Sequence, residues 1–350
     1  MNTSNVANST IWTEYRTSLT IWFAFMLTAG IIGAILNFLL IVAIMSKPRL
    51  RSGSGMLILN SLVINFILCA VEMPMMAASA YFGESTPFKP THYCRYLILF
   101  YYYHVYAANW AQLLIGVNRF IAVLFPHIYA TWTKPPMTFA MIVLPHLIPF
   151  VCTTVMFFDV GAHIQVMRPW GACGLQPTPG SSVYTSVIWV CVAIPIVIVF
   201  VLYSIIFLMV WTKSMVHSRQ VTDVNAAGQP TFRKRYRTVK VLFWTAMFYA
   251  VALIPAPIGS SFFAAQFNSM PFMQLFLRAL LLFCYATTPL IYLAKTADYR
   301  RCVVKLAMIV LPCVTSRQSV TPASISLNAK VRSRTGITRG DGHPVSELNE

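Results

Sequence analysis

The fold of this chain is decided by residues 92–124, which read HYCRYLILFYYYHVYAANWAQLLIGVNRFIAVL. This apolar run is longer than the roughly 18 residues that indicate a membrane-spanning helix. Its last turns contain Asn118-Arg119-Phe120, so a cation lies near the point where the helix leaves the apolar layer. A charged side chain is costly at such a place, and Arg119 is therefore a candidate for function rather than for packing.

Six further apolar runs accompany this one, and we expect each of them to span the membrane as a helix. They cover residues 19–45, 56–82, 137–158, 183–211, 237–262 and 272–294. Hydrophobic residues make up 57% of the 350 residues and charged residues only 10%, whereas a soluble domain carries about 25% charged residues. The ten-residue alternation of a membrane β-barrel is absent from the sequence. The sequence predicts an all-α, polytopic membrane protein: a seven-transmembrane helix bundle with a short amphipathic eighth helix.

Three parts are expected along the chain. Residues 1–18 form an extracellular N-terminus, residues 19–310 form the transmembrane domain with its amphipathic helix, and residues 311–350 form a cytoplasmic tail. The tail is rich in Ser and Thr, basic and poor in aromatic residues, which is typical of disorder. The polar first residues lack the pattern of a cleavable signal, so the first helix is expected to be a retained signal anchor.

The basic residues predict the orientation of the chain. Lys and Arg number 26 and the formal net charge is +17. Most of the basic residues lie in the segments 47–51 and 213–240 and in the chain after residue 294. The positive-inside rule then places the N-terminus outside and the C-terminus in the cytoplasm of a plasma-membrane protein. Basic clusters beside membrane helices favour anionic lipid as a partner over nucleic acid.

The predicted extracellular segment contains two sequons for N-glycosylation, Asn2-Thr3-Ser4 and Asn8-Ser9-Thr10. A sequon becomes a modification site only on the outer side of the membrane, which is where the charge pattern places both. Asn2 and Asn8 are therefore predicted glycosylation sites.

The eight cysteines separate by their depth in the membrane. Four lie within apolar runs and are interpreted as small buried hydrophobes: Cys69, Cys152, Cys191 and Cys284. Cys94 and Cys173 lie on the predicted outer, oxidising side, and a bridge between them would pin the loop before the fifth helix over the mouth of the bundle. Cys302 and Cys313 lie near a basic amphipathic stretch, where palmitoylation and free thiols are equally favoured.

Several motifs in order along the chain resemble those of rhodopsin-like G-protein-coupled receptors. Cys94 and Arg119 have the spacing found in that family, and Asn118-Arg119-Phe120 resembles its Asp-Arg-Tyr motif. Other matching segments are Gly33-Ala34-Ile35-Leu36-Asn37, Asn60 through Asn65, Pro195 with Tyr203, Thr288-Pro289-Leu290-Ile291-Tyr292, and Tyr299. The resemblance covers roughly residues 19–310. The Asn-Arg-Phe variant is similar to that of melatonin-like and of invertebrate orphan or chemosensory receptors.

This resemblance implies a receptor that binds an extracellular ligand within the helix bundle and activates heterotrimeric G proteins at its cytoplasmic face. It implies no enzymatic activity, no cofactor and no metal, and it makes arrestin and a receptor kinase further partners of the tail. The residues to which it assigns coupling and activation are Asn118, Arg119, Phe120, Tyr203, Arg235, Pro289 and Tyr292.

Two departures from the family pattern remove negative charge. Asn65 stands where the family has the Asp that holds a sodium ion, so we expect no tight sodium site. The alternative is that Asn65 hydrogen-bonds within the core. Asn118 and Arg235 stand where many relatives have acids that pair with the Arg of the motif. A like charge at Arg235 repels, so we expect a weakened resting latch and signalling without agonist.

The ligand-binding candidates are Glu72, Tyr101, Val105 and Arg278. Tyr101 and Leu282 occupy the positions of the Asp of amine receptors and the Lys of visual opsins, which argues against both ligand classes. Helical spacing from Asn65 and from Pro289 turns Glu72 and Arg278 inward. They either pair with each other as a structural pair, or Arg278 holds a ligand carboxylate.

Two other classes of function were weighed. A secondary transporter of a small solute is the alternative function, but it would show internal repeats, and the sequence has none that we detect. An intramembrane enzyme would need a nucleophile with its base or paired acids at mid-depth, and Glu72 has no obvious acidic partner.

Overall fold

The structure is a computed structural model that describes residues 3–51, 54–82, 91–167, 172–220, 247–255, 271–295 and 297–310. Its helices are α1 Thr3–Met45, η1 Pro48–Leu50, α2 Gly55–Ile67, η2 Leu68–Glu72, α3 Met73–Phe82, α4 Thr91–Leu124, α5 Pro126–Trp132, α6 Pro135–Phe157, α7 Val183–Ile188, η3 Trp189–Ala193, α8 Ile194–Gln220, α12 Pro271–Lys295 and α13 Ala297–Val310. Two strands, β1 Ala162–Met167 and β2 Ala172–Pro177, pair antiparallel.

Six of the seven predicted spans are confirmed as helices long and apolar enough to cross a membrane. The seventh, predicted at 237–262, lies largely outside the described residues, which include only 247–255 of it. The chain is therefore a multi-pass membrane protein. Helix α1 begins at Thr3, within the segment predicted to be extracellular, and the predicted boundary at residue 18 stays a prediction. No Gly or Pro interrupts residues 3–18, so nothing in that segment ends a helix.

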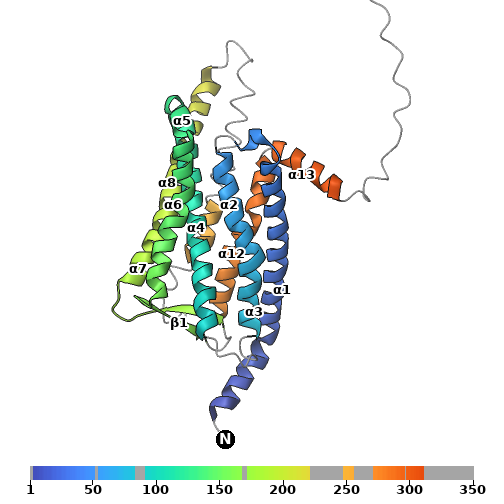
Figure 1. Cartoon of the computed structure of the whole chain (residues 1–350), viewed down its shortest axis with the longest axis vertical. Coiled ribbons are helices and arrows are strands. Elements are labelled where there is room, and N and C mark those ends of the chain that lie inside the picture. Colours follow the sequence, from blue (N-terminus) through green and yellow to red (C-terminus); the bar gives the residue numbers. More distant parts are fainter. Residues whose placement is uncertain are drawn as a thin grey trace, which may run out of the picture. The chain divides into compact units, whose positions relative to one another are not determined.

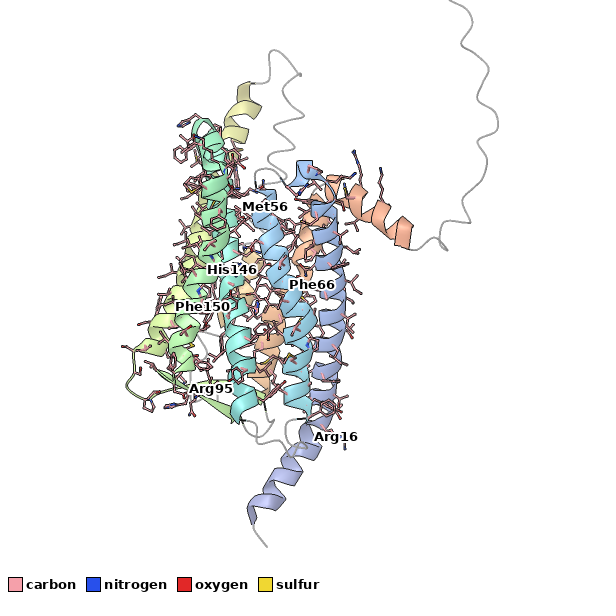
Figure 2. The ribbon with its side chains drawn as sticks, viewed as in Figure 1. Arg16, Met56, Phe66, Arg95, His146 and Phe150 are labelled. Carbon is pink, nitrogen blue, oxygen red and sulfur yellow. A yellow bond between two sulfur atoms is a disulfide. The ribbon has the colours of Figure 1, made fainter. Side chains whose placement is uncertain are left out.

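The outer faces of these helices carry large apolar side chains. Ile21, Phe150 and Leu208 are 61%, 60% and 58% exposed, and Figure 2 labels Phe150 on α6. In a bilayer such side chains contact lipid tails, so their exposure does not carry the free-energy cost of placing apolar surface in water.

Helix α4 lies at the centre of the bundle. It packs against α2, α6 and α8 and against both strands, whereas α1 packs against α2, α3 and α12 (Figure 1). Cys94 lies near the first residue of α4 and Arg119 near the last. At 1.5 Å per residue the two are separated by roughly 37 Å along the helix. We call these two ends of the bundle the hairpin end and the Arg119 end.

A disulfide attaches the hairpin to α4. Cys94 and Cys173 are bonded, with Cα atoms 5.2 Å apart, which confirms the predicted bridge. Cys173 lies on β2 opposite Val166 of β1. The strands themselves were not predicted from the sequence. The bridge holds β2 across the hairpin end, where Figure 2 also places Arg95.

Two spanning segments contain a π-helical turn close to a proline. The turn η2 (68–72) precedes Pro74, and η3 (189–193) precedes Pro195. Proline has no N–H, so it leaves the carbonyl four residues earlier without its helical donor. For Pro195 that carbonyl is Cys191, and it accepts a hydrogen bond from Asn109 Nδ2 at 3.2 Å. Tyr285 donates its hydroxyl to Asn109 Oδ1 at 3.2 Å, so one buried amide joins α4 to η3 and to α12.

The first helix packs closely on its neighbours through glycine. A Cβ added at Gly33 would lie 2.7 Å from Ala286 Cβ and 2.8 Å from Cys69 Sγ. Both atoms belong to other helices, so neither is free to withdraw like the end of a long side chain. Gly33 therefore allows α1 to contact η2 and α12 at once.

We predict that Gly33→Ala lowers the stability of the purified protein by ~1–3 kcal/mol, the usual cost of overpacking a core. The matched control is Gly116→Ala, where an added Cβ would meet no atom closer than 3.8 Å. Thermal unfolding in detergent measures both variants. Equal midpoints for the two variants would contradict the close packing of α1.

Candidate functional site

Arg119 lies in the last two turns of α4, where the sequence analysis placed it. Asn118 is almost fully buried, and its Nδ2 has no hydrogen-bond partner among the described residues. The guanidinium Nε of Arg119 is also buried and unpartnered within them. Phe120 packs against a small apolar cluster that contains Tyr203 and Ile206 of α8. The motif therefore combines a ring packed between helices with two polar groups that have unused donors.

Beside Arg119 lies a cavity of about 60 Å³, which we call the Arg119 cavity. Its walls come from α4, α8, α12 and residues 249–253. The lining residues are Asn109, Gln112, Ile115, Arg119, Pro195, Ile196, Val199, Tyr203, Tyr249, Ala250, Leu253, Thr288, Ile291 and Tyr292. Three residues of the predicted coupling set, Arg119, Tyr203 and Tyr292, are thus brought to one cavity.

Hydrogen bonds join several lining residues. The hydroxyls of Tyr249 and Thr288 are hydrogen-bonded to each other, and Thr288 donates to the carbonyl of Cys284 at 2.8 Å. Asn109 contributes the junction described above. The cavity thus has a hydrogen-bonded wall near Asn109 and, at Arg119, a cation without an acidic partner among the residues that the structure describes.

The structure describes only some of the other predicted coupling residues. Pro289 lies inside α12, one turn from Tyr292. Arg235 lies outside the described residues, so its predicted position opposite Arg119 stays a prediction. Asn65 is fully buried, and neither atom of its amide has a hydrogen-bond partner in the described part of the chain. The core hydrogen bond considered for Asn65 is therefore absent there.

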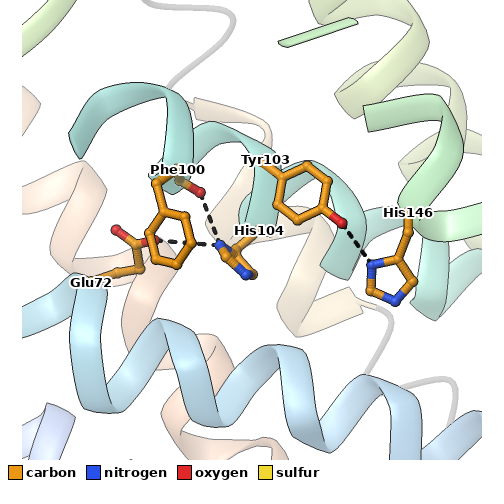
Figure 3. Close-up of polar contacts among 5 residues, drawn as sticks. All are labelled: Glu72, Phe100, Tyr103, His104 and His146. Carbon is orange, nitrogen blue, oxygen red and sulfur yellow. Dashed lines mark hydrogen bonds and ion pairs between the residues drawn. The ribbon is translucent and has the colours of Figure 1, made fainter. Parts of the chain in front are cut away.

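Glu72 and Arg278 do not pair with each other, which corrects one of the two alternatives drawn from the sequence. The Glu72 carboxylate is fully buried, and its Oε1 lies 3.4 Å from His104 Nδ1 (Figure 3). The same nitrogen lies 2.9 Å from the carbonyl of Phe100. A carbonyl only accepts, so Nδ1 carries a proton, and that N–H lies between the two oxygens.

A second histidine continues this polar arrangement toward α6. Tyr103 lies next to His104 in the chain, and its hydroxyl is 3.0 Å from His146 Nδ1 (Figure 3). His146 Nε2 is 3.1 Å from Asn60 Oδ1 on α2. Since that oxygen accepts, Nε2 is the protonated nitrogen and Nδ1 accepts from Tyr103. The roles of His104 and His146 were not predicted from the sequence, where the signal for each was a polar side chain within an apolar run.

The remaining ligand candidates lie toward the hairpin end. Arg278 Nη1 donates to the carbonyl of Cys173 at 3.2 Å, so the cation contacts the disulfide-bonded strand. Tyr101 and Val105 are buried, at 2% and 4% exposure, one turn apart on α4. These contacts explain what holds Arg278 in place without requiring Glu72.

The predicted modification sites are described only in part. Cys302 is a half-buried free cysteine on α13, whereas Cys313 lies outside the described residues. Asn2 also lies outside them, and Asn8 belongs to α1 without a described side chain. Palmitoylation and glycosylation therefore stay predictions, as does the position of α13 against the membrane surface.

Comparison with known families gives one match. The model of the family described as 7 transmembrane receptor (rhodopsin family) matches residues 36–292, which is well over half of the chain. A search of curated proteins finds no match for this chain. The matched range includes α4, the hairpin, and all residues that line the Arg119 cavity.

We predict that His104→Leu lowers stability by ~3 kcal/mol, because it leaves the buried Glu72 carboxylate without its nearest polar neighbour. Adding Glu72→Gln should recover most of this loss, because it removes the charge that the leucine leaves unpaired. Thermal unfolding of the purified protein measures both effects. The matched control is His163→Leu, at an exposed position on β1. If His104→Leu alone is as stable as the parent chain, the stability of the protein does not depend on the contact between Glu72 and His104.

Proposed function

Because the chain belongs to the rhodopsin family of seven-transmembrane receptors, we propose that it binds an extracellular ligand within the helix bundle and activates heterotrimeric G proteins at its cytoplasmic face. One observation carries this proposal: Arg119 borders a cavity between α4, α8 and α12 together with Tyr203 and Tyr292. A cation beside a cavity at the end of the bundle suits contact with a partner protein, because no ion pair with a described residue engages it.

The route from ligand to partner runs along α4. The half of α4 nearer the hairpin contains Tyr101 and Val105, and the opposite end contains Arg119. Between them Asn109 bonds α4 to Cys191 and to Tyr285. A ligand that binds one arrangement of these helices more tightly than another shifts the population toward it. The bonds of Asn109 are discrete contacts that such a shift can make or break.

The ligand site we propose lies at the hairpin end, at Glu72, Tyr101, Val105 and Arg278. Arg278 uses one nitrogen for the carbonyl of Cys173. A guanidinium has five N–H donors, so a ligand carboxylate can bind the remaining ones. The tyrosine contributes an apolar ring with a polar tip. We therefore propose a ligand that carries an acidic group.

The orientation and the cellular setting are parts of the same proposal. We place the hairpin end outside the cell and the Arg119 end in the cytoplasm of the plasma membrane, as the distribution of Lys and Arg favours. Glycosylation of Asn2 and Asn8 and palmitoylation of Cys302 and Cys313 fit these sides. Phosphorylation of the Ser/Thr-rich tail by a receptor kinase would add the charge through which arrestin binds.

The transporter alternative is not favoured, since the family that matches consists of receptors. Members of this family are generally not enzymes, and we propose no reaction for this chain. A panel of chimeric G proteins, tested against candidate acidic ligands, distinguishes the two classes. Solute flux without nucleotide exchange on any G protein would favour the transporter.

We predict that the chain raises G-protein nucleotide exchange above an empty vector without any ligand, and that Asn118→Asp lowers this basal signal by about tenfold. The introduced carboxylate restores the missing acid beside Arg119, and a hydrogen bond between charged groups contributes ~1.5–3 kcal/mol to the resting state. The readout is basal exchange at matched surface expression. Arg51→Ala, at an exposed position after η1, is the control and should leave the signal unchanged. A basal output equal to the empty vector counts against a weakened latch.

For any agonist identified in the ligand screen, we predict that Arg278→Ala removes the response and leaves surface expression intact. The reason is loss of the cation that binds the acidic group, and Arg278→Lys should restore part of the response. Leu280→Ala, at a lipid-facing position of the same helix, is the matched control. If Arg278→Ala abolishes expression instead, the arginine serves only to hold Cys173 in place.

A further inference from the structure

The Arg119 cavity contains a cation with no described acid to neutralise it. The structure describes the side chains of two acidic residues, Glu72 and Asp159. Glu72 lies beside His104 and Asp159 pairs with Arg95, so neither neutralises Arg119. The neighbouring residue Asn118 is neutral. A cation removed from water is costly unless an opposite charge or acceptor compensates it. The described residues around Arg119 supply no such charge.

Several groups near this cation can donate hydrogen bonds. Arg119 itself has only N–H groups, and its Nε is buried without a partner in the described part of the chain. The hydroxyls of Tyr203 and Tyr292 lie within electrostatic range of the guanidinium, and both tyrosines line the cavity. A phenolic O–H can turn its proton toward an acceptor. A positive charge flanked by two such hydroxyls is a set of groups that suits an anion.

We propose that the Arg119 cavity binds a small inorganic anion, held by the guanidinium of Arg119 and by the hydroxyls of Tyr203 and Tyr292. Chloride and phosphate share the required chemistry, because both are compact acceptors of several hydrogen bonds. The volume of about 60 Å³ is several times the ~10–15 Å³ that one water molecule needs on this measure, so the cavity has room for the ion with part of its water shell. Anion binding rests on the geometry alone, whereas any effect of the ion on signalling rests on the proposed function.

The bound anion has a consequence for the resting state. It compensates the charge of Arg119 without a carboxylate from the chain, so it replaces the acids that this sequence lacks beside the arginine. A G protein that reaches Arg119 must then displace the anion. High anion concentration should therefore favour the resting state.

The test uses the purified full-length protein in lipid nanodiscs, without ligand or G protein. Chloride is titrated against gluconate at constant ionic strength, and the NMR line width of chloride reports binding. The expected result is saturable broadening in excess of empty nanodiscs. Arg119→Gln should weaken this binding by about tenfold or more, because it removes a charge-assisted hydrogen bond.

Three further variants separate a specific site from general charge. Arg300→Gln removes an exposed cation of α13 and should leave the broadening unchanged. Arg119→Lys keeps the charge and should retain weaker binding. Tyr203→Phe combined with Tyr292→Phe removes both hydroxyls and leaves the cation in place, and it should weaken binding without abolishing it. Thermal unfolding confirms that each variant is folded.

Competition between chloride and other anions identifies the class of anion that binds, and the variants give the results that would overturn the proposal. Displacement of chloride by bromide alone indicates a site for halides, whereas displacement by phosphate at lower concentration indicates an oxyanion. Broadening that never saturates, or that persists unchanged in folded Arg119→Gln, overturns the proposal. Basal nucleotide exchange in chloride and in gluconate is measured separately. Loss of exchange with binding intact would therefore count against the proposed function and not against the anion site.

Discussion

Inside a bilayer no water is present to donate a hydrogen bond to a backbone carbonyl that has lost its helical donor. Such a carbonyl therefore needs another donor from the protein. Pro195 creates this requirement at Cys191, and the side chain of Asn109 meets it. The same amide accepts from Tyr285, so satisfying one carbonyl fixes the relative positions of α4, η3 and α12. The Arg119 cavity lies beside this junction, with Asn109 and Pro195 both in its wall. Its shape therefore follows from a proline and an asparagine that are far apart in the sequence.

The buried polar groups toward the hairpin end also need partners from the protein, and histidine side chains lie beside several of them. The Oε1 atom of Glu72 lies 3.4 Å from Nδ1 of His104, and the N–H on that nitrogen donates to the carbonyl of Phe100. His146 joins Tyr103 to Asn60 and so connects α6 to α4 and α2. The hydrogen bonds of His146 join neutral groups, so they hold these helices together without a net charge at the contact. They also fix which ring nitrogen is protonated, because each carbonyl or amide oxygen only accepts.

Much of the architecture was predictable because lipid imposes long apolar runs and an oxidising exterior favours the Cys94–Cys173 bridge. The inward direction of Glu72 was also predictable, but its partner was not. Spacing from Asn65 assumed a regular helix, whereas the turn η2 is wider than an α-helical turn and ends at Glu72 itself. This turns the carboxylate toward α4 rather than α12. The hairpin escaped prediction because its pairing depends on a distant cysteine, and the short strands carry no strong periodic signal of their own.

The distribution of charge inside the bundle distinguishes this chain from the pattern that its motifs resemble. Asn65 and Asn118 are neutral where that pattern has acids, and the one buried carboxylate with a described side chain is paired with a histidine. Ion pairs in a low dielectric separate two conformations by large energies, whereas neutral hydrogen bonds contribute about 0.5–1.5 kcal/mol each. A bundle held mainly by neutral contacts has a smaller energy difference between its arrangements. Arg119 then becomes the residue whose surroundings matter most, because the guanidinium is the strongest electrostatic feature of the cavity and any anion that reaches it changes the balance between those arrangements.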